Sequence, residues 1–349
     1  MDKLKLGMIG AGYIGQLGHL ANFAQLSGCE VTALADLRPA LREQVAGRHG
    51  IEHTYASHRE LLENSDVDAV VVVTPRSQTY SVALDCLLAG KHVLTEKPMA
   101  VSVDEGEALV AAAAEQRVRY CVGYMKRYDA GVDEARRMLA DPALIDALGP
   151  IRFARGHCYM GDSYCNAGGQ IETGERAGYP DNYARVAPDW VPLQHRENYG
   201  SFINTYSHVT NLLRYLFGSQ PTVEYTHLGS RESQLCVLRF GSFLASLETG
   251  RSSSRDWEEE VVLFFDHGKL TLKMPPALLR NTPARVELYT AGQEQQIVRP
   301  LCDWSWSFQN QARAFVSDVR ENRPSRIDGA DALEDLRLAE ELWRRDLAK

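Results

Sequence analysis

Three polar side chains recur at helical spacing in the apolar stretch 199–218, YGSFINTYSHVTNLLRYLFG. Asn204, His208 and Asn211 stand at i, i+4 and i+7, so a helix would carry them on one face. A neutral imidazole at His208 could take a proton from a hydroxyl group, and the amide of Asn204 could donate and accept hydrogen bonds. The same row could instead be a hydrogen-bonded patch within a core.

Lys97 is a second residue suited to proton chemistry, in the triplet Glu96-Lys97-Pro98 that ends the segment KHVLTEKP. A lysine at the edge of a binding crevice could donate a hydrogen bond to an alcohol oxygen, lower the pKa of that oxygen, and relay its proton as a hydride leaves the carbon. Burial near other positive charge would push the pKa of the lysine toward neutrality. The simpler alternative is a solvated lysine in a loop.

Gly10, Gly12 and Gly15 form the pattern Gly-x-Gly-x-x-Gly between a predicted strand, LKLGMIG, and a predicted helix. Such glycines permit a tight turn, let the backbone approach a pyrophosphate and pack the helix on the strand, and the helix N-terminus then faces the phosphates. A glycine-rich turn can also be purely structural. We interpret the motif, with Tyr13 and Ile14 inside it, as a dinucleotide site.

Asp36 supports that interpretation because it ends a second predicted strand, 21 residues after Gly15. A carboxylate at this place can accept hydrogen bonds from both hydroxyls of the adenosine ribose, and it repels the 2′-phosphate of NADP. NAD is therefore the expected cofactor. Arg38 could contact a 2′-phosphate or stack on adenine, so some use of NADP stays open; it could equally be a solvated residue at a helix start.

Alternating strands and helices must position these residues. Segments with strand character alternate with helical segments up to residue 123. This alternation favours a parallel sheet with right-handed crossovers, which predicts a Rossmann domain over residues 1–123. Ligands bind beyond the carboxyl ends of such strands, which is where the sequence places Thr74, Pro75, Glu96 and Lys97.

Residues 124–349 form the expected second domain, because the composition changes where a charged helix, MKRYDAGVDEARRMLAD, begins. Several β-type segments separated by turn signals indicate antiparallel hairpins, and hence an α+β domain with a large, open, mostly antiparallel sheet. Two helices are expected at the C-terminal end. Trp304, Trp306 and Phe308 are expected to be packing anchors there.

The segment 161–198 is too long and polar for an ordinary connection, and loops of that length are usually functional or disordered. We interpret it as a loop that covers the substrate, in which Tyr164 and His195 would contact sugar faces and hydroxyls. The alternative is an arm that contacts another subunit. Carboxylates in this segment would suit a cationic aminosugar: Glu172, Glu175, Asp181, Asp189 and Glu197.

The bulk composition excludes some classes of partner. The net charge is −8 and the sequence pI is near 5.7, so the chain lacks the basic footprint that binds nucleic acid or anionic membranes. No apolar run reaches the roughly 20 residues that span a bilayer. Seven scattered cysteines, with no Cys-x-x-Cys pair and no histidine cluster at zinc spacing, predict no metal site and a reduced, cytoplasmic setting.

Three segments resemble the Gfo/Idh/MocA oxidoreductase family: GMIGAGYIG, TPRSQTYSVALDCLLAGKHVLTEKP and the stretch 199–218. The resemblance covers nearly the whole chain in order. It implies a Rossmann domain followed by a domain with a large open sheet, a nicotinamide cofactor, and a secondary alcohol of a sugar or cyclitol as substrate. It assigns Lys97 to the substrate hydroxyl and Glu96 to cofactor-side positioning, with a cis peptide bond between Lys97 and Pro98. A homodimer or homotetramer built through the open sheet is also implied.

The chain departs from the family pattern after Thr74-Pro75. The family commonly has Asn next and His three residues later, whereas this chain has Arg76 and Thr79. The usual contacts around the nicotinamide ribose are therefore not all expected here.

A second departure lies in the stretch that carries His208. The family pattern Asp-x-Gly-x-His-x-x-Asp falls on Asn204, Tyr206, His208 and Asn211, so only the histidine is retained. An amide at Asn204 cannot supply negative charge, and we expect it to orient a substrate hydroxyl or the lysine. Lys97 and His208 both remain candidates for the principal base.

The resulting prediction is an NAD-dependent dehydrogenase for a secondary alcohol of a sugar, aminosugar or cyclitol, with Arg127 among the substrate contacts. A role in antibiotic biosynthesis is a narrower hypothesis. Two alternatives remain: an NAD-dependent glycosidase that oxidises its substrate transiently, and a non-catalytic protein that senses NAD. Retention of Lys97 and His208 argues against the second.

Overall fold

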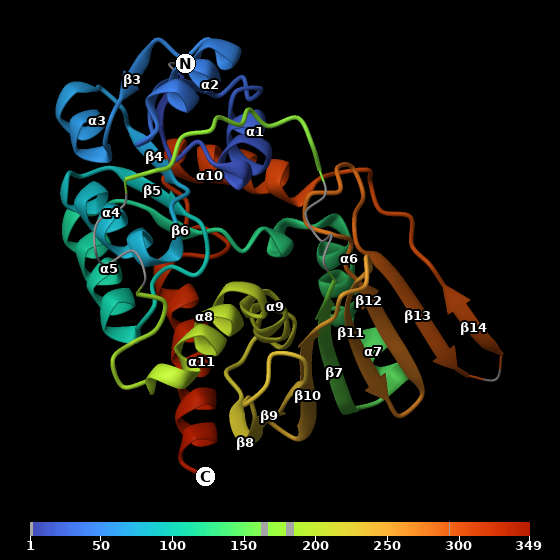
Figure 1. The fold of residues 1–349 in the computed structure, drawn as a ribbon. Coiled ribbons are helices and arrows are strands. Elements are labelled where there is room, and N and C mark those ends of the chain that lie inside the picture. The colour runs from blue at the N-terminus through green and yellow to red at the C-terminus, as the bar shows by residue number, and fades with distance from the viewer. Residues whose placement is uncertain (1–2, 162–166, 179–184, 293) are drawn as a thin grey trace. The chain divides into compact units, whose positions relative to one another are not determined.

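The computed structural model describes residues 3–161, 167–178, 185–292 and 294–349. The chain forms two compact units, and Figure 1 follows it from end to end. The N-terminal unit comprises Met1–Tyr124, Gly168–Arg196 and Phe308–Leu336, and the C-terminal unit comprises Met125–Ala167, Glu197–Ser307 and Arg337–Lys349. The chain leaves the N-terminal unit after Tyr124, next to the boundary predicted at residue 123. It returns to that unit at Gly168 and again at Phe308, so each unit is formed by three separate segments of the chain.

The N-terminal unit is built on a six-stranded sheet in which every pairing is parallel, in the order β3-β2-β1-β4-β5-β6. The strands are β1 (Leu4–Ile9), β2 (Cys29–Ala35), β3 (His53–Tyr55), β4 (Ala69–Val72), β5 (His92–Thr95) and β6 (Tyr120–Val122). β4 is buried along its whole length, as expected for a strand covered on both faces. This strand order confirms the predicted Rossmann fold.

Helices connect these strands and bury their apolar sides on the sheet. They are η1 (Gly15–Leu20, of π type), α1 (Ala21–Phe23), α2 (Pro39–His49), α3 (His58–Asn64), α4 (Arg76–Leu88) and α5 (Val103–Gln116). A helix from far along the sequence, α10 (Ser307–Arg320), joins them. Its Phe315 is buried and packs edge-on against Phe23, with the ring centroids 6.2 Å apart. A C-terminal helix therefore completes the core of the first sheet.

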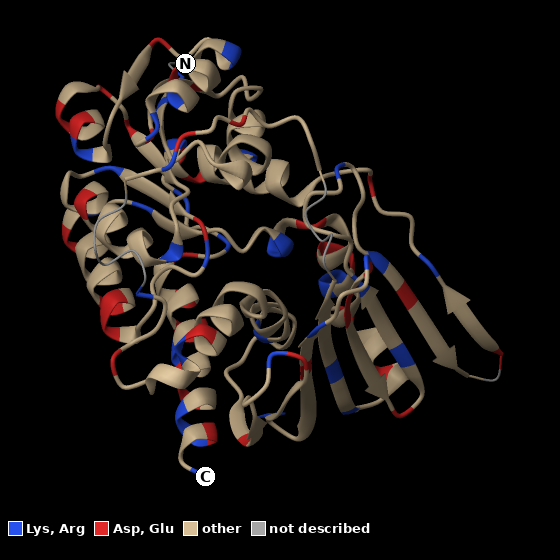
Figure 2. Ribbon diagram, viewed as in Figure 1, with Lys and Arg blue, Asp and Glu red and all other residues tan. Residues whose placement is uncertain are grey.

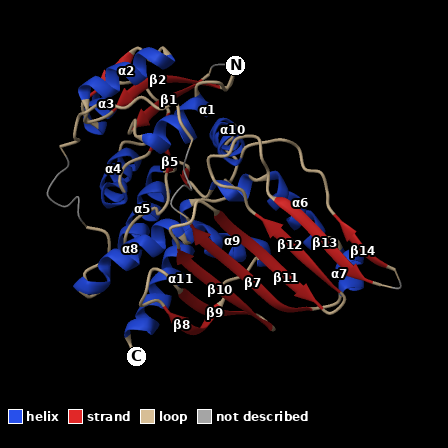
Figure 3. Ribbon diagram, turned by 45° about the vertical axis from the view of Figure 1, so that its right-hand side comes forward, coloured by secondary structure: helices blue, strands red, loops and turns tan. Residues whose placement is uncertain are grey.

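The C-terminal unit is built on an eight-stranded sheet, in the order β14-β13-β12-β11-β7-β10-β9-β8 (Figure 3). The strands are β7 (Ile151–Met160), β8 (Thr222–His227), β9 (Gln234–Phe240), β10 (Phe243–Arg251), β11 (Trp257–Phe265), β12 (Gly268–Lys273), β13 (Arg285–Ala291) and β14 (Gln295–Val298). Among these described strands, β7 and β10 pair in parallel and the other neighbours are antiparallel. The predicted mostly antiparallel sheet is confirmed.

The helices of the C-terminal unit are η2 (Met125–Tyr128), α6 (Ala130–Leu139), α7 (Pro142–Leu148), α8 (Arg196–Thr205), α9 (Ser207–Phe217) and the last part of α11 (Gly329–Leu347). Trp343 of α11 is fully buried and packs edge-on against Tyr199, with the ring centroids 5.8 Å apart. No helix within the described ranges is long and apolar enough to cross a membrane.

Residues of β7 alternate between a covered and a free face of the large sheet. Gly156 lies under α9, where Leu213 comes within 3.0 Å of the position that a Cβ would take, and Cys158 is buried. Phe153 and Tyr159 point to the opposite face and are each 37% exposed. The predicted homodimer or homotetramer would form on this free face, and that assembly stays a prediction.

The stretch 199–218 forms two helices, so the single predicted helix is wrong. α8 ends at Thr205, Tyr206 has φ −92° and ψ −5°, and α9 begins at Ser207. The side chain of Tyr206 is buried, and its hydroxyl donates a hydrogen bond of 2.7 Å to the carbonyl of Gly250 in β10. The bend therefore coincides with a tertiary contact that helical periodicity does not reveal.

The three aromatic residues predicted as C-terminal anchors differ in burial. Trp306 is buried and its indole nitrogen donates a hydrogen bond of 3.1 Å to the carbonyl of Ala277. Phe308 is buried beside His19, with the ring centroids 5.4 Å apart. Trp304 is 88% exposed, so the prediction that it anchors the packing is wrong.

Candidate active site

A cavity of about 1020 Å³ opens at the carboxyl ends of β1, β2 and β4 in the N-terminal unit. Its walls contain most of the residues that the sequence predicts for a cofactor: Gly10, Gly12, Tyr13, Ile14, Gly15, Asp36, Arg38, Thr74 and Pro75. Glu96 and Lys97, which were also predicted to contact the cofactor, are not among the lining residues.

The three glycines of the turn fit a dinucleotide. Gly10 has a φ of +97°, and a Cβ there would lie 2.2 Å from the carbonyl oxygen of Val73. A Cβ at Gly15 would lie 2.4 Å from the carbonyl oxygen of Gly10. At Gly12 the nearest atom to such a Cβ is an Arg38 nitrogen 4.0 Å away, so packing does not require glycine there. The bare backbone at Gly12 instead allows the close approach that a pyrophosphate needs.

Asp36 is a charged acceptor at the edge of this cavity. Its Oδ2 accepts a hydrogen bond of 2.8 Å from the amide of Ala11, and its Oδ1 accepts one of 2.9 Å from the amide of Arg38. Burial alone would raise the pKa of Asp36, but the hydrogen bonds from the Arg38 side chain and from the two amides lower it below its usual value. Asp36 therefore stays ionised and suits a pair of ribose hydroxyls.

Glu96 is held by a histidine that the sequence did not single out. Its Oε1 lies 2.7 Å from Nε2 of His19, and its Oε2 accepts a hydrogen bond of 3.1 Å from the amide of Lys97. His19 is almost completely buried on η1. The Lys97-Pro98 peptide bond is cis, as the family resemblance implies. The carboxylate of Glu96 thus ties the first helix to the end of β5, while Lys97 itself is partly exposed.

Thr79 fills the place where the family commonly has histidine. It is buried on α4, and its hydroxyl lies 3.5 Å from the hydroxyl of Thr74 and 3.4 Å from the carbonyl of Pro75. A threonine at this place therefore packs beneath the turn that follows β4. Arg76, at the other position of departure, is the first residue of α4.

Arg127 is a buried cation in the C-terminal unit. Its Nε donates a hydrogen bond of 2.8 Å to Oδ1 of Asn211, and its guanidinium carbon lies 4.6 Å from the ring centroid of Tyr215. Because Arg127 is only 3% exposed, these contacts show it fastening η2 to α9. Asn211, which replaces the last family Asp, is a partner of this arginine, and a substrate contact of Arg127 stays a prediction.

Asn204 and His208 lie on either side of the bend at Tyr206, Asn204 in the last turn of α8 and His208 in the first turn of α9. Both side chains are partly exposed, in contrast to Tyr206 and Asn211. The two residues belong to the C-terminal unit and Lys97 belongs to the N-terminal unit. A shared site for Lys97, Asn204 and His208 stays a prediction.

The described part of the long segment from Gly168 onward is attached to the Rossmann fold. The side-chain amide of Gln16 binds both backbone groups of Ile171, accepting from its nitrogen at 2.7 Å and donating to its carbonyl at 3.0 Å. Arg48 donates a hydrogen bond of 2.6 Å to the carbonyl of Gly169, and Ala177 lines the cavity. This stretch therefore borders the cofactor cavity; whether the segment covers a substrate stays a prediction.

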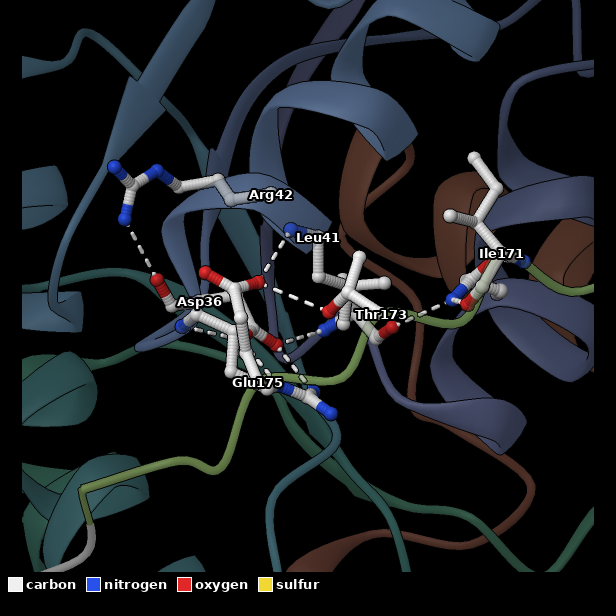
Figure 4. Close-up of polar contacts among 9 residues, drawn as sticks. Asp36, Leu41, Arg42, Ile171, Thr173 and Glu175 are labelled. Carbon is white, nitrogen blue, oxygen red and sulfur yellow. Dashed lines mark hydrogen bonds and ion pairs between the residues drawn. The ribbon is translucent and has the colours of Figure 1, made fainter.

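Glu175 in this segment binds a helix end, which the sequence did not anticipate. Its Oε1 accepts a hydrogen bond of 3.0 Å from the amide of Ala40, and its Oε2 accepts one of 2.9 Å from the amide of Leu41 (Figure 4). Backbone hydrogen bonds, first that of Ala40, lower the pKa of the Glu175 carboxyl. Both oxygens of Glu175 thus bind the start of α2, and a contact of Glu175 with a cationic substrate stays a prediction.

Other predicted residues of the segment fall elsewhere. His195 ends the short helix η4 (Leu193–His195), is partly exposed and belongs to the N-terminal unit. Tyr164 and Asp181 lie outside the described residues. Their contacts with a substrate stay predictions.

A group of side chains of metal-ligand type lies on the large sheet. Side-chain nitrogen and oxygen atoms of His157, Glu258 and Glu260 lie within 4.8 Å of one another. Lys273 already donates a hydrogen bond of 3.0 Å to Glu258, and Figure 2 shows acidic and basic residues interspersed on these strands. The group thus includes an ion pair of the sheet surface, and we assign it no metal.

Comparison with known proteins identifies the first segment of the N-terminal unit. Residues 4–124 match the family model described as "Oxidoreductase family, NAD-binding Rossmann fold". The chain is 23% identical to the uncharacterized oxidoreductase YrbE of Bacillus subtilis, over 97% of this chain and 92% of that protein. It is 34% identical to an inositol 2-dehydrogenase of Ralstonia nicotianae, over 46% of this chain and 48% of that protein.

Solved structures share the whole fold. The WlbA dehydrogenase of Bordetella pertussis, in complex with NADH and UDP-GlcNAcA, superposes with a TM-score of 0.74 at 19% identity, over 99% of this chain and 96% of that chain. KijD10 of Actinomadura kijaniata, a 3-ketoreductase in complex with NADP and TDP-benzene, superposes with a TM-score of 0.77 at 18% identity, over 98% of each chain. Residues 4–124 thus match the NAD-binding Rossmann domain of the Gfo/Idh/MocA oxidoreductase family, and the similarity to YrbE and to the solved structures extends over nearly the whole chain.

Proposed function

We propose that this chain is an NAD-dependent dehydrogenase that transfers a hydride between nicotinamide and a secondary alcohol or keto group of a sugar, aminosugar or cyclitol. The observation that carries the proposal is the cavity that joins the glycine turn to the ionised Asp36, which fits a dinucleotide without a 2′-phosphate. The inositol 2-dehydrogenase among the relatives, and the neighbour that binds NADH and UDP-GlcNAcA, support this substrate class.

The proton chemistry would be supplied by the chain. The bound nicotinamide would accept the hydride as the C–H bond of the alcohol breaks. The O–H proton would pass to a neutral base, and Lys97 after β5 and His208 at the start of α9 are the two proposed bases. Asn204, which lies four positions before His208, would orient the hydroxyl by donating and accepting hydrogen bonds. In ketone reduction the same groups return the proton.

An aminosugar is the narrower version of this proposal, and a place in antibiotic biosynthesis is narrower still. An ammonium group would need a carboxylate that is not already engaged. Glu172 is an exposed candidate with one oxygen bound by Gln170, whereas both oxygens of Glu175 bind amides of α2. Isothermal titration with aminosugars and their neutral counterparts separates the versions, and equal affinity for both would exclude the aminosugar version.

The experiment that tests the function is a substrate screen. Purified protein is incubated with NAD and a panel of sugars, aminosugars and cyclitols, and NADH absorbance is followed. A steady rise with one substrate class is expected. Cleavage of a glycoside without net NADH would instead favour the glycosidase with transient oxidation, and NAD binding without either reaction would favour a protein that senses NAD.

A further inference from the structure

Helix α2 begins at the edge of the cofactor cavity without a carboxylate of its own. Its N-cap residue is Arg38, Pro39 follows, and its first turn contains no acidic residue. Proline has no amide hydrogen, so Ala40 and Leu41 offer the first backbone donors of the helix. Helix N-terminal amides and the helix dipole favour an anion at this place.

Glu175 supplies that anion from a point 135 residues away from Ala40. Each oxygen of its carboxylate accepts one of the two amide hydrogens, and the Thr173 hydroxyl donates a further hydrogen bond of 2.9 Å to Oε2. Figure 4 shows the Glu175 carboxylate and its hydrogen bonds to Thr173 and Leu41. The carboxylate is therefore fixed by three hydrogen bonds.

The segment that carries Glu175 is itself held against the fold. The reciprocal pair between Gln16 and Ile171 fixes it four residues before Glu175, and the wall of the cavity includes Ala177 two residues after it. Arg38, which pairs with Asp36, is close enough to contribute to the lowered pKa of Glu175. The carboxylate of Glu175 is thus fixed at the start of α2, the helix that follows Asp36 in the sequence.

We propose that Glu175 sets the cofactor preference of this enzyme by excluding the 2′-phosphate of NADP. A 2′-phosphate next to Asp36 would meet a second fixed negative charge, and it would find the amides of Ala40 and Leu41 already occupied. NAD carries a hydroxyl at that position and meets neither obstacle. This inference rests on the proposed NAD-dependent function and deepens it. The fold alone does not decide the cofactor, because similar structures contain NADH in one case and NADP in another.

The test is the affinity of the full-length protein for NAD and NADP, measured by isothermal titration. Glu175→Gln removes the charge and keeps the size of the side chain, and Glu175→Ala frees both amides. Glu172→Gln is the matched control, because Glu172 lies on the same segment, is exposed, and accepts a hydrogen bond from Gln170 at 2.6 Å. Losing one nearby negative charge should tighten NADP binding about tenfold. Glu175→Gln should therefore show this gain in NADP affinity, and Glu175→Ala should show a gain at least as large. NAD affinity should stay nearly unchanged in both variants.

The outcomes separate this inference from the proposed function. If wild-type protein binds NAD but both Glu175 variants change NAD and NADP affinity by the same factor, Glu175 only supports the segment and the inference is overturned. The same holds if wild-type protein binds NADP as tightly as NAD. If wild-type protein binds neither dinucleotide, the proposed function fails, and this inference fails with it. An equal gain in NADP affinity from Glu172→Gln would also overturn the inference, because the effect would then not be specific to Glu175.

Discussion

The carboxylate of Asp36 and the guanidinium of Arg38 form a two-point pair, with Nε to Oδ1 and Nη2 to Oδ2 both at 2.9 Å. The amides of Ala11 and Arg38 bind the same two oxygens, so all four acceptor positions of the carboxylate are used. A ribose can therefore bind Asp36 only when the Arg38 side chain moves away. That side chain is 23% exposed, which leaves it room to turn toward solvent or adenine.

We expect Asp36→Asn to weaken NAD binding about tenfold, because a charged acceptor of two ribose hydroxyls is replaced by a neutral one. Loss of the charge should weaken NADP binding less, so the preference between the dinucleotides should narrow. Titration calorimetry with both cofactors measures the effect.

The control for Asp36→Asn is Asp66→Asn, which removes a surface carboxylate paired with Lys5 and should leave both affinities unchanged. The lowered pKa of Asp36 adds a pH signature. The carboxyl group of Asp36 is fully ionised at any pH well above the usual pKa of an aspartate, and it is protonated only when the pH falls below that pKa. Protonation of Asp36 should therefore not reduce NAD affinity between roughly pH 8 and pH 5. A tenfold loss across that range that is absent in Asp36→Asn would contradict the assignment.

Tyr206→Phe removes the hydroxyl that joins the bend between α8 and α9 to Gly250. We expect a loss of roughly 1 kcal/mol in the free energy of unfolding, since the buried carbonyl of Gly250 loses this donor. Urea unfolding followed by circular dichroism measures it. Tyr225→Phe is the matched control, because Tyr225 is 47% exposed and should tolerate the change. Equal stability of Tyr206→Phe and wild type would show that the bend does not depend on this hydrogen bond.

Asn204→Asp restores the carboxylate that the family pattern has at this position. A negative charge four residues before His208 should raise the pKa of that imidazole, because it stabilises the protonated form. A base must be neutral to accept a proton, so the acidic limb of the pH profile of kcat/KM should move to higher pH. An acidic limb that stays in place would argue that His208 is not the titrating base.

The overall fold was predictable because its evidence is local. The buried strands, the glycine turn and the alternating helices of the first unit all follow from short-range patterns, and β1, β2, β4, β5 and β6 lie where those patterns place them. The described elements that were not predicted are β3, α3, α7, β14 and η4, which have three, seven, seven, four and three residues. Such short elements carry too few residues to show a period.

The polar contacts of the site were less predictable because they are not local. Glu96 binds His19 from 77 residues away, and Glu175 binds α2 from 135 residues away. The segment around Glu175 has no periodicity that would indicate which surface it lies on. Its residues could be recognised as carboxylates, but the partner of each carboxylate depends on the folded chain.

The central claim is hydride transfer assisted by Lys97, and the most direct test compares NADH formation by wild-type protein and Lys97→Ala on the substrate found in the screen. We predict that Lys97→Ala binds NAD with wild-type affinity but turns over ~10²- to 10⁴-fold more slowly, the usual contribution of a positioned acid or base. Lys5→Ala, a surface lysine of the same unit, should keep full activity. Full activity of Lys97→Ala would contradict the proposed mechanism.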